Sequence, residues 1–206
     1  MIDRRTVLKS LALAACPALL TRPASAAPQS QPWTERLVDA AFQQVGVTVI
    51  YDPAYVRLDY PGGDVPAERG VCTDVVVRAY RKAFDVDLQR LVNEDMRAAF
   101  SAYPTIWGRK QPDRNIDHRR VPNLETFFKR KGAALEVVDD AAAYRPGDLV
   151  TQRLPGNLPH IAIVTNRMTS DGQRPLVVHN IGAGARVEDT LFAFRIAGHF
   201  RFAPEV

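Results

Sequence analysis

Cysteine is scarce in this chain, since only Cys16 and Cys72 occur among its 206 residues. Cys16 falls in a segment that we interpret as a removable leader, so its cleavage leaves Cys72 alone and excludes a disulfide within the mature chain. The sequence also has no CxxC pair and no HExxH motif, which are spacings that signal a zinc site. An unpaired thiol is a liability in an oxidising compartment, which favours a reactive role for Cys72.

The chain also lacks an apolar run long enough to span a membrane. Residues 11–20 are apolar but short; they follow a charged start that contains Arg4 and Arg5, and they precede Ala24-Ser25-Ala26. This pattern is typical of an export signal over residues 1–26, and the paired arginines resemble a twin-arginine signal. A Sec signal is the alternative, and Leu13-Ala14-Ala15-Cys16 also resembles a lipobox that directs lipoprotein processing at Cys16.

The mature chain has almost no net charge. The whole chain has a formal net charge of +4, but four cations and one anion lie in residues 1–26, which leaves the rest near +1. The basic balance therefore gives no argument for a nucleic acid or an anionic membrane as partner. We expect no cofactor, a proline-marked linker over residues 27–33, and a single domain over residues 34–206.

Helical periodicity comes first in this domain and strand patterns come last. Apolar residues at helical spacing predict helices over residues 34–44, from Cys72 to about residue 84, over 87–99 and over 123–130. Runs of β-forming residues predict strands over residues 47–51, 135–138, 149–151, 160–165, 175–180, 191–195 and 199–202. Helices followed by an antiparallel meander make the predicted fold class α+β.

Cys72 lies where a glycine-rich loop gives way to an amphipathic helix. The positive end of a helix dipole and its unpaired N–H groups favour a thiolate, so this is a suitable place for a nucleophile. Packing as a small apolar core residue is the alternative for Cys72.

Two histidines have positions that suit a partner for this thiol. His160 opens one predicted strand and His179 ends the next, so a hairpin brings them to the same sheet edge. His179, or its neighbour Asn180, is then within reach of the other nitrogen of His160. A structural role is the alternative for His160, and Cys72, His160 and His179 as zinc ligands are another.

The other two histidines of the mature chain give weaker signals. His199, near the C-terminus, is expected to be structural. His118 lies among Asp117, Arg119 and Arg120, which form either a solvated charge cluster or a loop that contacts substrate.

Several motifs resemble the NlpC-type papain-like cysteine peptidases over about residues 51–189. They are Tyr60-Pro61-Gly62-Gly63, Cys72 at a helix start, Pro146-Gly147-Asp148-Leu149-Val150, His160-Ile161-Ala162-Ile163-Val164 and Val178-His179. A narrower set resembles the DUF1287 family of exported bacterial proteins, whose name carries no established activity. This set is Tyr60-Pro61-Gly62-Gly63-Asp64-Val65-Pro66, Gly70-Val71-Cys72-Thr73-Asp74-Val75, the stretch from Asn115 to Asn123, and His179-Asn180-Ile181-Gly182-Ala183-Gly184. The usual Asp-Cys-Ser-Gly around the nucleophile is replaced here by Val71-Cys72-Thr73-Asp74.

The resemblance implies a papain-like (NlpC-type) fold in which the helix that begins at the nucleophile packs on an antiparallel sheet. It implies Cys72 as nucleophile, His160 as base and His179 as third residue, with Tyr60 and the Cys72 N–H stabilising the oxyanion. We expect His118, Arg119 and Arg120 to contact carboxylates of the substrate.

The usual substrates of the superfamily imply an exported, periplasmic or cell-envelope hydrolase that cleaves an amide bond in peptidoglycan stem peptides. One alternative is a catalytically silent cell-wall-binding module on the same fold. Another is a cysteine amidase or acyltransferase that acts on a different amide.

Overall fold

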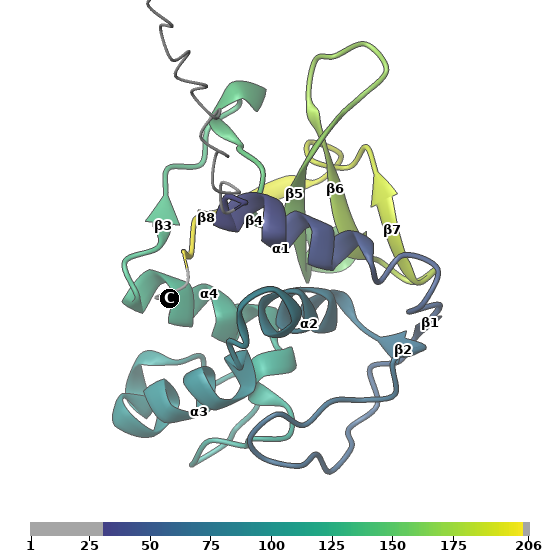
Figure 1. Ribbon diagram of the computed structural model, residues 1–206. Helices are drawn as coiled ribbons and strands as arrows, with labels where there is room; N and C mark the ends of the chain where they lie inside the picture. The colour runs from purple at the N-terminus through teal and green to yellow at the C-terminus, as the bar shows by residue number, and fades with distance from the viewer. Residues whose placement is uncertain (1–30, 204–206) are drawn as a thin grey trace, which may run out of the picture. The chain divides into compact units, whose positions relative to one another are not determined.

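A computed structural model describes residues 31–203 of the chain (Figure 1). The predicted leader, its cleavage site and the lipobox lie outside these residues. The α-helices are α1 (Trp33–Phe42), α2 (Cys72–Phe84), α3 (Leu88–Ala98) and α4 (Val121–Arg130). The strands are β1 (Ile50–Tyr51), β2 (Arg69–Gly70), β3 (Ala134–Leu135), β4 (Leu149–Leu154), β5 (Leu158–Met168), β6 (Pro175–Asn180), β7 (Ala185–Glu188) and β8 (Arg195–Phe200).

Six strands form one antiparallel sheet in the order β3-β8-β4-β5-β6-β7. Strands β4 to β7 follow one another as a meander, and β8 returns to pair with β4. The predicted hairpin is present as β5 and β6, whose register aligns Ile163 with Val178. The predicted α+β class with an antiparallel sheet is therefore confirmed.

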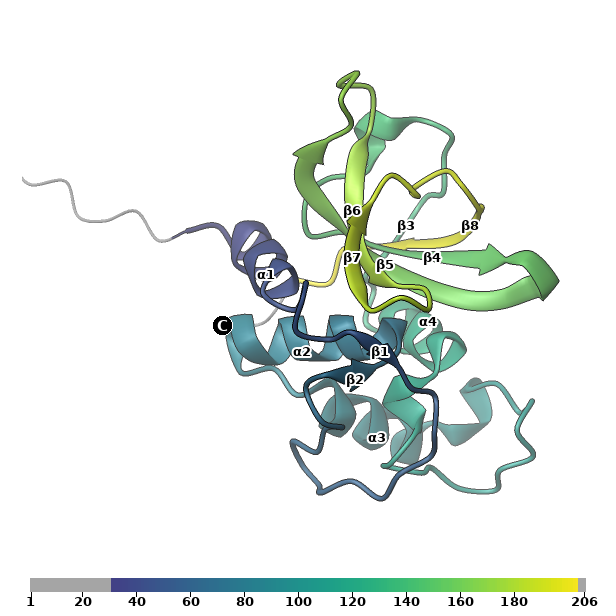
Figure 2. The same cartoon turned by 90° about the vertical axis from the view of Figure 1, so that its right-hand side faces the viewer.

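Helix α2 lies between the sheet and α3 (Figures 1 and 2). Its apolar face shares a core with the side chains that β5 turns toward the helices, among them Ile161 and Ile163. The alternate residues of β5, Ala162 and Val164, belong to a second cluster on the other face of the sheet. Both faces of β5 are thus buried, and the start of α2 is packed against this strand.

Several element boundaries differ from the predictions. Residues 191–195 were predicted as a strand, but β8 begins only at Arg195, and no element was predicted for the residues of the short edge strand β7. Helix α4 begins at Val121 because Pro122 suits the first turn of a helix. Asn123 consequently does not cap this helix; its Nδ2 donates to the Asp117 carbonyl at 3.1 Å.

Within residues 31–203, no helix has the length and apolar character that crossing a membrane requires.

Candidate active site

Cys72 is the first residue of α2, and the acidic residue that follows it explains why the helix begins there. The Asp74 carboxylate accepts a hydrogen bond from the Val71 N–H at 2.7 Å, which satisfies a donor just before the helix. Val71 itself is extended, with φ −117° and ψ −177°. The Asp74 side chain therefore fixes the point at which the chain turns into α2, and with it the position of the thiol.

The thiol is buried, and its burial outweighs the effect of the helix start. Desolvation raises the pKa of Cys72 to about 11, and the nearby charge of Asp74 raises it as well. The backbone N–H groups of Ile161, Thr73 and Cys72 face the sulfur and lower the pKa, but by less. The N–H groups at the helix start therefore favour the thiolate as expected, but burial outweighs them, and the neutral thiol predominates at neutral pH.

The two predicted histidines meet in a chain of short hydrogen bonds. His160 Nε2 lies 2.8 Å from His179 Nδ1, and His179 Nε2 lies 2.8 Å from Glu188 Oε2. Burial lowers the pKa of His160 to about 3 and also lowers that of His179. Both rings are therefore neutral at neutral pH. Glu188 lies at the end of this series of hydrogen bonds, and the sequence analysis did not identify it.

The thiol reaches β5 beside His160, at the backbone of Ile161. Because side chains alternate along a strand, His160 leaves β5 on the same side as Ala162, whereas Cys72 packs in the core that contains Ile161. Among residues 31–203, no hydrogen bond joins the Cys72 sulfur to an imidazole nitrogen. The catalytic roles of Cys72, His160 and His179 stay predictions.

Asn180 forms hydrogen bonds with the loop before the thiol and not with His160. Its Nδ2 donates to the Gly70 carbonyl at 3.0 Å, and its Oδ1 accepts from the Gly182 N–H at 3.2 Å. Of the two residues considered as the third member, His179 is therefore the one that contacts His160.

Cys72 opens into a cleft of about 190 Å³. Its lining includes Tyr51, Val71, Trp107, Arg120 and Pro159. The Arg120 guanidinium lies 4.1 Å from the centre of the Trp107 ring and donates to Asp117 at 3.1 Å. Burial raises the pKa of Tyr51, as does its proximity to Cys72, so this phenol is protonated and is able to donate a hydrogen bond.

Tyr60 does not line this cleft, contrary to the prediction for the oxyanion. Its ring lies 5.5 Å from the guanidinium carbon of Arg114. Tyr51, the last residue of β1, is the tyrosine beside the thiol, and the sequence analysis did not consider it for this role.

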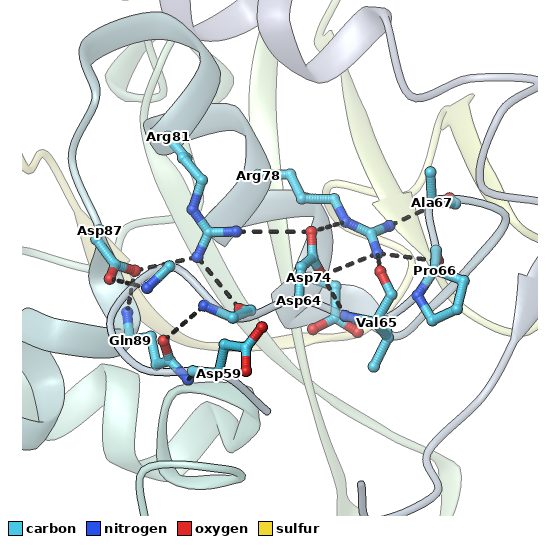
Figure 3. A network of polar contacts seen from close by, with 12 residues as sticks. Asp59, Asp64, Val65, Pro66, Ala67, Asp74, Arg78, Arg81, Asp87 and Gln89 are labelled. Carbon is cyan, nitrogen blue, oxygen red and sulfur yellow. Dashed lines mark hydrogen bonds and ion pairs between the residues drawn. The ribbon is translucent and has the colours of Figure 1, made fainter. Parts of the chain in front are cut away.

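The loop that carries Tyr60 is held against the far part of α2 (Figure 3). Arg78 binds both oxygens of Asp64 at 2.8 and 3.0 Å, and Arg81 donates to Asp87 at 3.1 Å. Gln89 accepts from the Gly63 N–H at 3.0 Å. A residue at position 81 lies about 13 Å along the helix axis from the thiol, so these contacts hold the loop away from Cys72.

Contrary to the prediction, Arg119 and His118 are engaged or buried within the fold and are not available to a substrate. Arg119 Nε and Nη2 bind the two oxygens of Asp74 at 2.9 Å each, and its Nη1 and Nη2 donate to the carbonyls of Ala54 and Asp52 at 3.1 Å. His118 is 2% exposed, and burial lowers its pKa to about 3. Arg119 and Arg120 both line the cleft, but the Arg119 guanidinium is bound to Asp74 and to the carbonyls of Ala54 and Asp52.

The structure also bears on the zinc alternative and on His199. Within residues 31–203, no three His, Cys, Asp or Glu side chains are arranged to hold a metal ion, so Cys72, His160 and His179 do not form the zinc site considered above. His199 lies 2.7 Å from Asp148 and stacks on Tyr144, and this network is separate from the cleft.

Two comparisons with known proteins apply to this domain. A family described as "Domain of unknown function (DUF1287)" matches residues 38–202. A relative from Escherichia coli (strain K12), described as "Uncharacterized protein YijF", is 55% identical over 166 residues, which cover 81% of this chain and 80% of the relative.

Proposed function

Because the chain belongs to the DUF1287 family, whose description states no activity, we propose from the site itself that it is an exported cysteine hydrolase of the periplasm or cell envelope. Its proposed substrate is an amide bond in peptidoglycan stem peptides, and its proposed fold is papain-like of the NlpC type. The observation that carries this proposal is the position of Cys72. This residue lies at the first turn of α2, in a cleft, with its sulfur at the backbone next to a hydrogen-bonded histidine pair.

In the proposed first step, His160 Nδ1 takes the proton of the Cys72 thiol while the sulfur attacks the carbonyl carbon. Within the part of the chain that the structure describes, Nδ1 has no hydrogen-bond partner, whereas Nε2 is bonded to His179. The thiol and the ring must approach to hydrogen-bond distance in the substrate complex, because catalytic hydrogen bonds often tighten only there. The carbonyl oxygen becomes an oxyanion that the N–H groups at the start of α2 and the Tyr51 hydroxyl stabilise.

In the proposed second step, the tetrahedral intermediate collapses and its C–N bond breaks. The leaving amine takes the proton from the His160 imidazolium, and the acyl group stays on sulfur as a thioester. Water then attacks the thioester, gives one proton to His160 and releases the carboxylic acid. The thiolate recovers that proton, so the reaction consumes one water for each amide bond cleaved.

The cleft suits a substrate that carries a free carboxylate. Arg120 keeps its planar face on Trp107 and shares only part of its donors with Asp117. A guanidinium presents several donors in a fork that matches a carboxylate. Stem peptides carry such carboxylates, and of the three residues expected in this role we propose that Arg120 binds one of them.

The test is digestion of purified muropeptides by the mature protein, followed by mass spectrometry. We expect a product that Cys72→Ser and His160→Gln both abolish. His118→Gln is the matched control, because His118 and His160 are equally buried at 2% exposure and both pKa values are lowered to about 3. Activity that survives Cys72→Ser, or that falls equally in both histidine variants, contradicts the proposal.

A catalytically silent cell-wall-binding module is the second candidate. Two observations favour it: burial raises the pKa of the Cys72 thiol to about 11, and no hydrogen bond joins this thiol to an imidazole within residues 31–203. This candidate predicts that the protein binds sacculi and that Cys72→Ala leaves the binding unchanged. It also predicts that iodoacetamide does not label Cys72 at neutral pH, whether or not muropeptide is present.

A further inference from the structure

Glu188, on the edge strand β7, contacts His179 of the histidine pair. The register of β6 and β7 aligns Val177 with Glu188 and His179 with Arg186, so Glu188 and His179 extend from the same face of neighbouring strands. Their side chains meet at 2.8 Å, between Oε2 and Nε2. The His179 side chain is fully buried, whereas that of Glu188 is 34% exposed. The carboxylate thus reaches a buried ring from a partly solvated position.

The chemistry of this contact determines which nitrogen of His179 carries the proton. An ionised carboxylate only accepts hydrogen bonds, so His179 Nε2 must carry a hydrogen to donate. Burial lowers the pKa of His179, and the ring is neutral. A neutral imidazole has one N–H, so His179 Nδ1 is left as an acceptor.

The same constraint passes to His160. Its Nε2 lies 2.8 Å from the acceptor nitrogen of His179, so Nε2 must carry the hydrogen. The opposite assignment would place a lone pair of His179 against the carboxylate, which is repulsive. With one hydrogen on a neutral ring, His160 Nδ1 is left with a lone pair that can accept a proton.

We propose that Glu188 is a positioning residue that fixes the tautomers of His179 and His160, so that His160 presents an unprotonated Nδ1. The inference rests on the proposed function only in assigning that lone pair to the Cys72 proton. The tautomers themselves are properties of the folded protein and are measurable without a substrate.

The first test is the tautomer of each ring at pH 7, from two-bond ¹H–¹⁵N correlations of ¹⁵N-histidine-labelled mature protein. We expect the Nε2–H form for both His160 and His179. A wild-type spectrum with the Nδ1–H form at either ring overturns the proposal without any variant.

The second test is Glu188→Gln, whose amide can donate to His179 Nε2 where the carboxylate cannot. We expect the Nδ1–H form to appear at both histidines in this variant. Asp189→Asn is the matched control, because it removes one negative charge from the adjacent residue, which binds Arg174 at 2.7 Å and not the histidines. Spectra that stay in the Nε2–H form in both Glu188→Gln and Glu188→Met refute a role of Glu188 in setting the tautomers.

A reactivity measurement separates this inference from the proposed function. With a muropeptide substrate, we expect Glu188→Gln to lower the hydrolysis rate at least about tenfold, because a base in the wrong tautomer cannot accept the proton. Unchanged hydrolysis beside changed tautomers means that the lone pair of His160 is not used, which overturns the catalytic part of the inference. If wild-type protein gives no Cys72-dependent product but its tautomers shift in Glu188→Gln, the proposed function fails and the positioning role of Glu188 stands.

Discussion

Replacing Arg119 by methionine removes one half of a buried ion pair at the start of α2. The Arg119 and Asp74 side chains are 2% and 4% exposed, and two hydrogen bonds of 2.9 Å join them. Methionine has a similar length but no charge, so it fills much of the same space. Asp74 would then keep only its bond to the Val71 N–H, with its charge in a buried site.

The expected loss of stability follows from these contacts. Breaking a buried ion pair by removing one partner costs about 3–5 kcal/mol, because the other charge is left without compensation. The carbonyls of Ala54 and Asp52 also lose the donors that Arg119 supplies at 3.1 Å. A single domain has a free energy of unfolding of about 5–15 kcal/mol, so the variant is expected to fold but with a large part of its stability lost.

The assay is equilibrium unfolding of the mature protein in urea, followed by tryptophan fluorescence and far-UV circular dichroism. Arg90→Gln is the matched control, because its pair with Glu94 is solvent-exposed, at 47% and 53%. Exposed pairs of this kind contribute about 0–1 kcal/mol. Adding Asp74→Leu to Arg119→Met removes the uncompensated charge, so the double variant is expected to recover part of the loss.

A loss for Arg119→Met that is no larger than that for Arg90→Gln would refute this reasoning. So would a double variant whose loss equals the sum of the two single losses, since residues in contact are expected to show a coupling energy.

Other expectations follow from the same structure. Burial lowers the pKa values of His118 and His160 to about 3 in the folded protein, whereas histidine in the unfolded chain titrates near 6.5. The contribution of these neutral rings to the free energy of unfolding is therefore complete above about pH 6.5 and is lost as the pH falls toward 3. Each contributes a slope of about 1.4 kcal/mol per pH unit, and urea midpoints that stay constant from pH 7 to pH 5 would contradict this. Asn180→Ala removes the 3.0 Å donor to the Gly70 carbonyl, which keeps the Asp52 N–H at 3.2 Å, so the variant is expected to cost about 0.5–1.5 kcal/mol in urea unfolding; an unchanged urea midpoint would contradict this. Tyr51→Phe is expected to preserve the urea midpoint while it lowers muropeptide hydrolysis, and equal rates would remove Tyr51 from the oxyanion site.

Local patterns were sufficient to predict the elements that carry the site. The four-residue spacing of apolar residues identified α2 from its first residue, and β-rich runs identified the hairpin of β5 and β6. The hairpin in turn brought His160 and His179 to one place, because antiparallel neighbours fix which residues lie opposite. Each of these inferences needed only the periodicity of one segment or the pairing of two consecutive ones.

Contacts between distant segments were not predictable in this way. Asp74 and Arg119 are 45 residues apart, and the chain contains many other acidic and basic residues that could have paired with either. Glu188 belongs to β7, a strand of four residues, Ala-Arg-Val-Glu, whose pattern is too short and polar to identify. The charge of Arg119 was therefore assigned to a substrate, although the fold uses it internally.

The error about the thiol is one of magnitude. A helix N-terminus stabilises a negative charge by about 0.3–1 kcal/mol, which corresponds to less than one unit of pKa. Burial of Cys72 instead moves its pKa from 9.0 to about 11, which corresponds to about 3 kcal/mol against the thiolate. The dipole argument had the correct sign, but desolvation is the larger effect at this position. A preformed thiolate–imidazolium pair is thus disfavoured twice, since burial also lowers the pKa of His160 to about 3. In the proposed mechanism the proton must therefore leave the thiol as the sulfur attacks, and a His160 Nδ1 that is already unprotonated is the feature that makes such a step feasible.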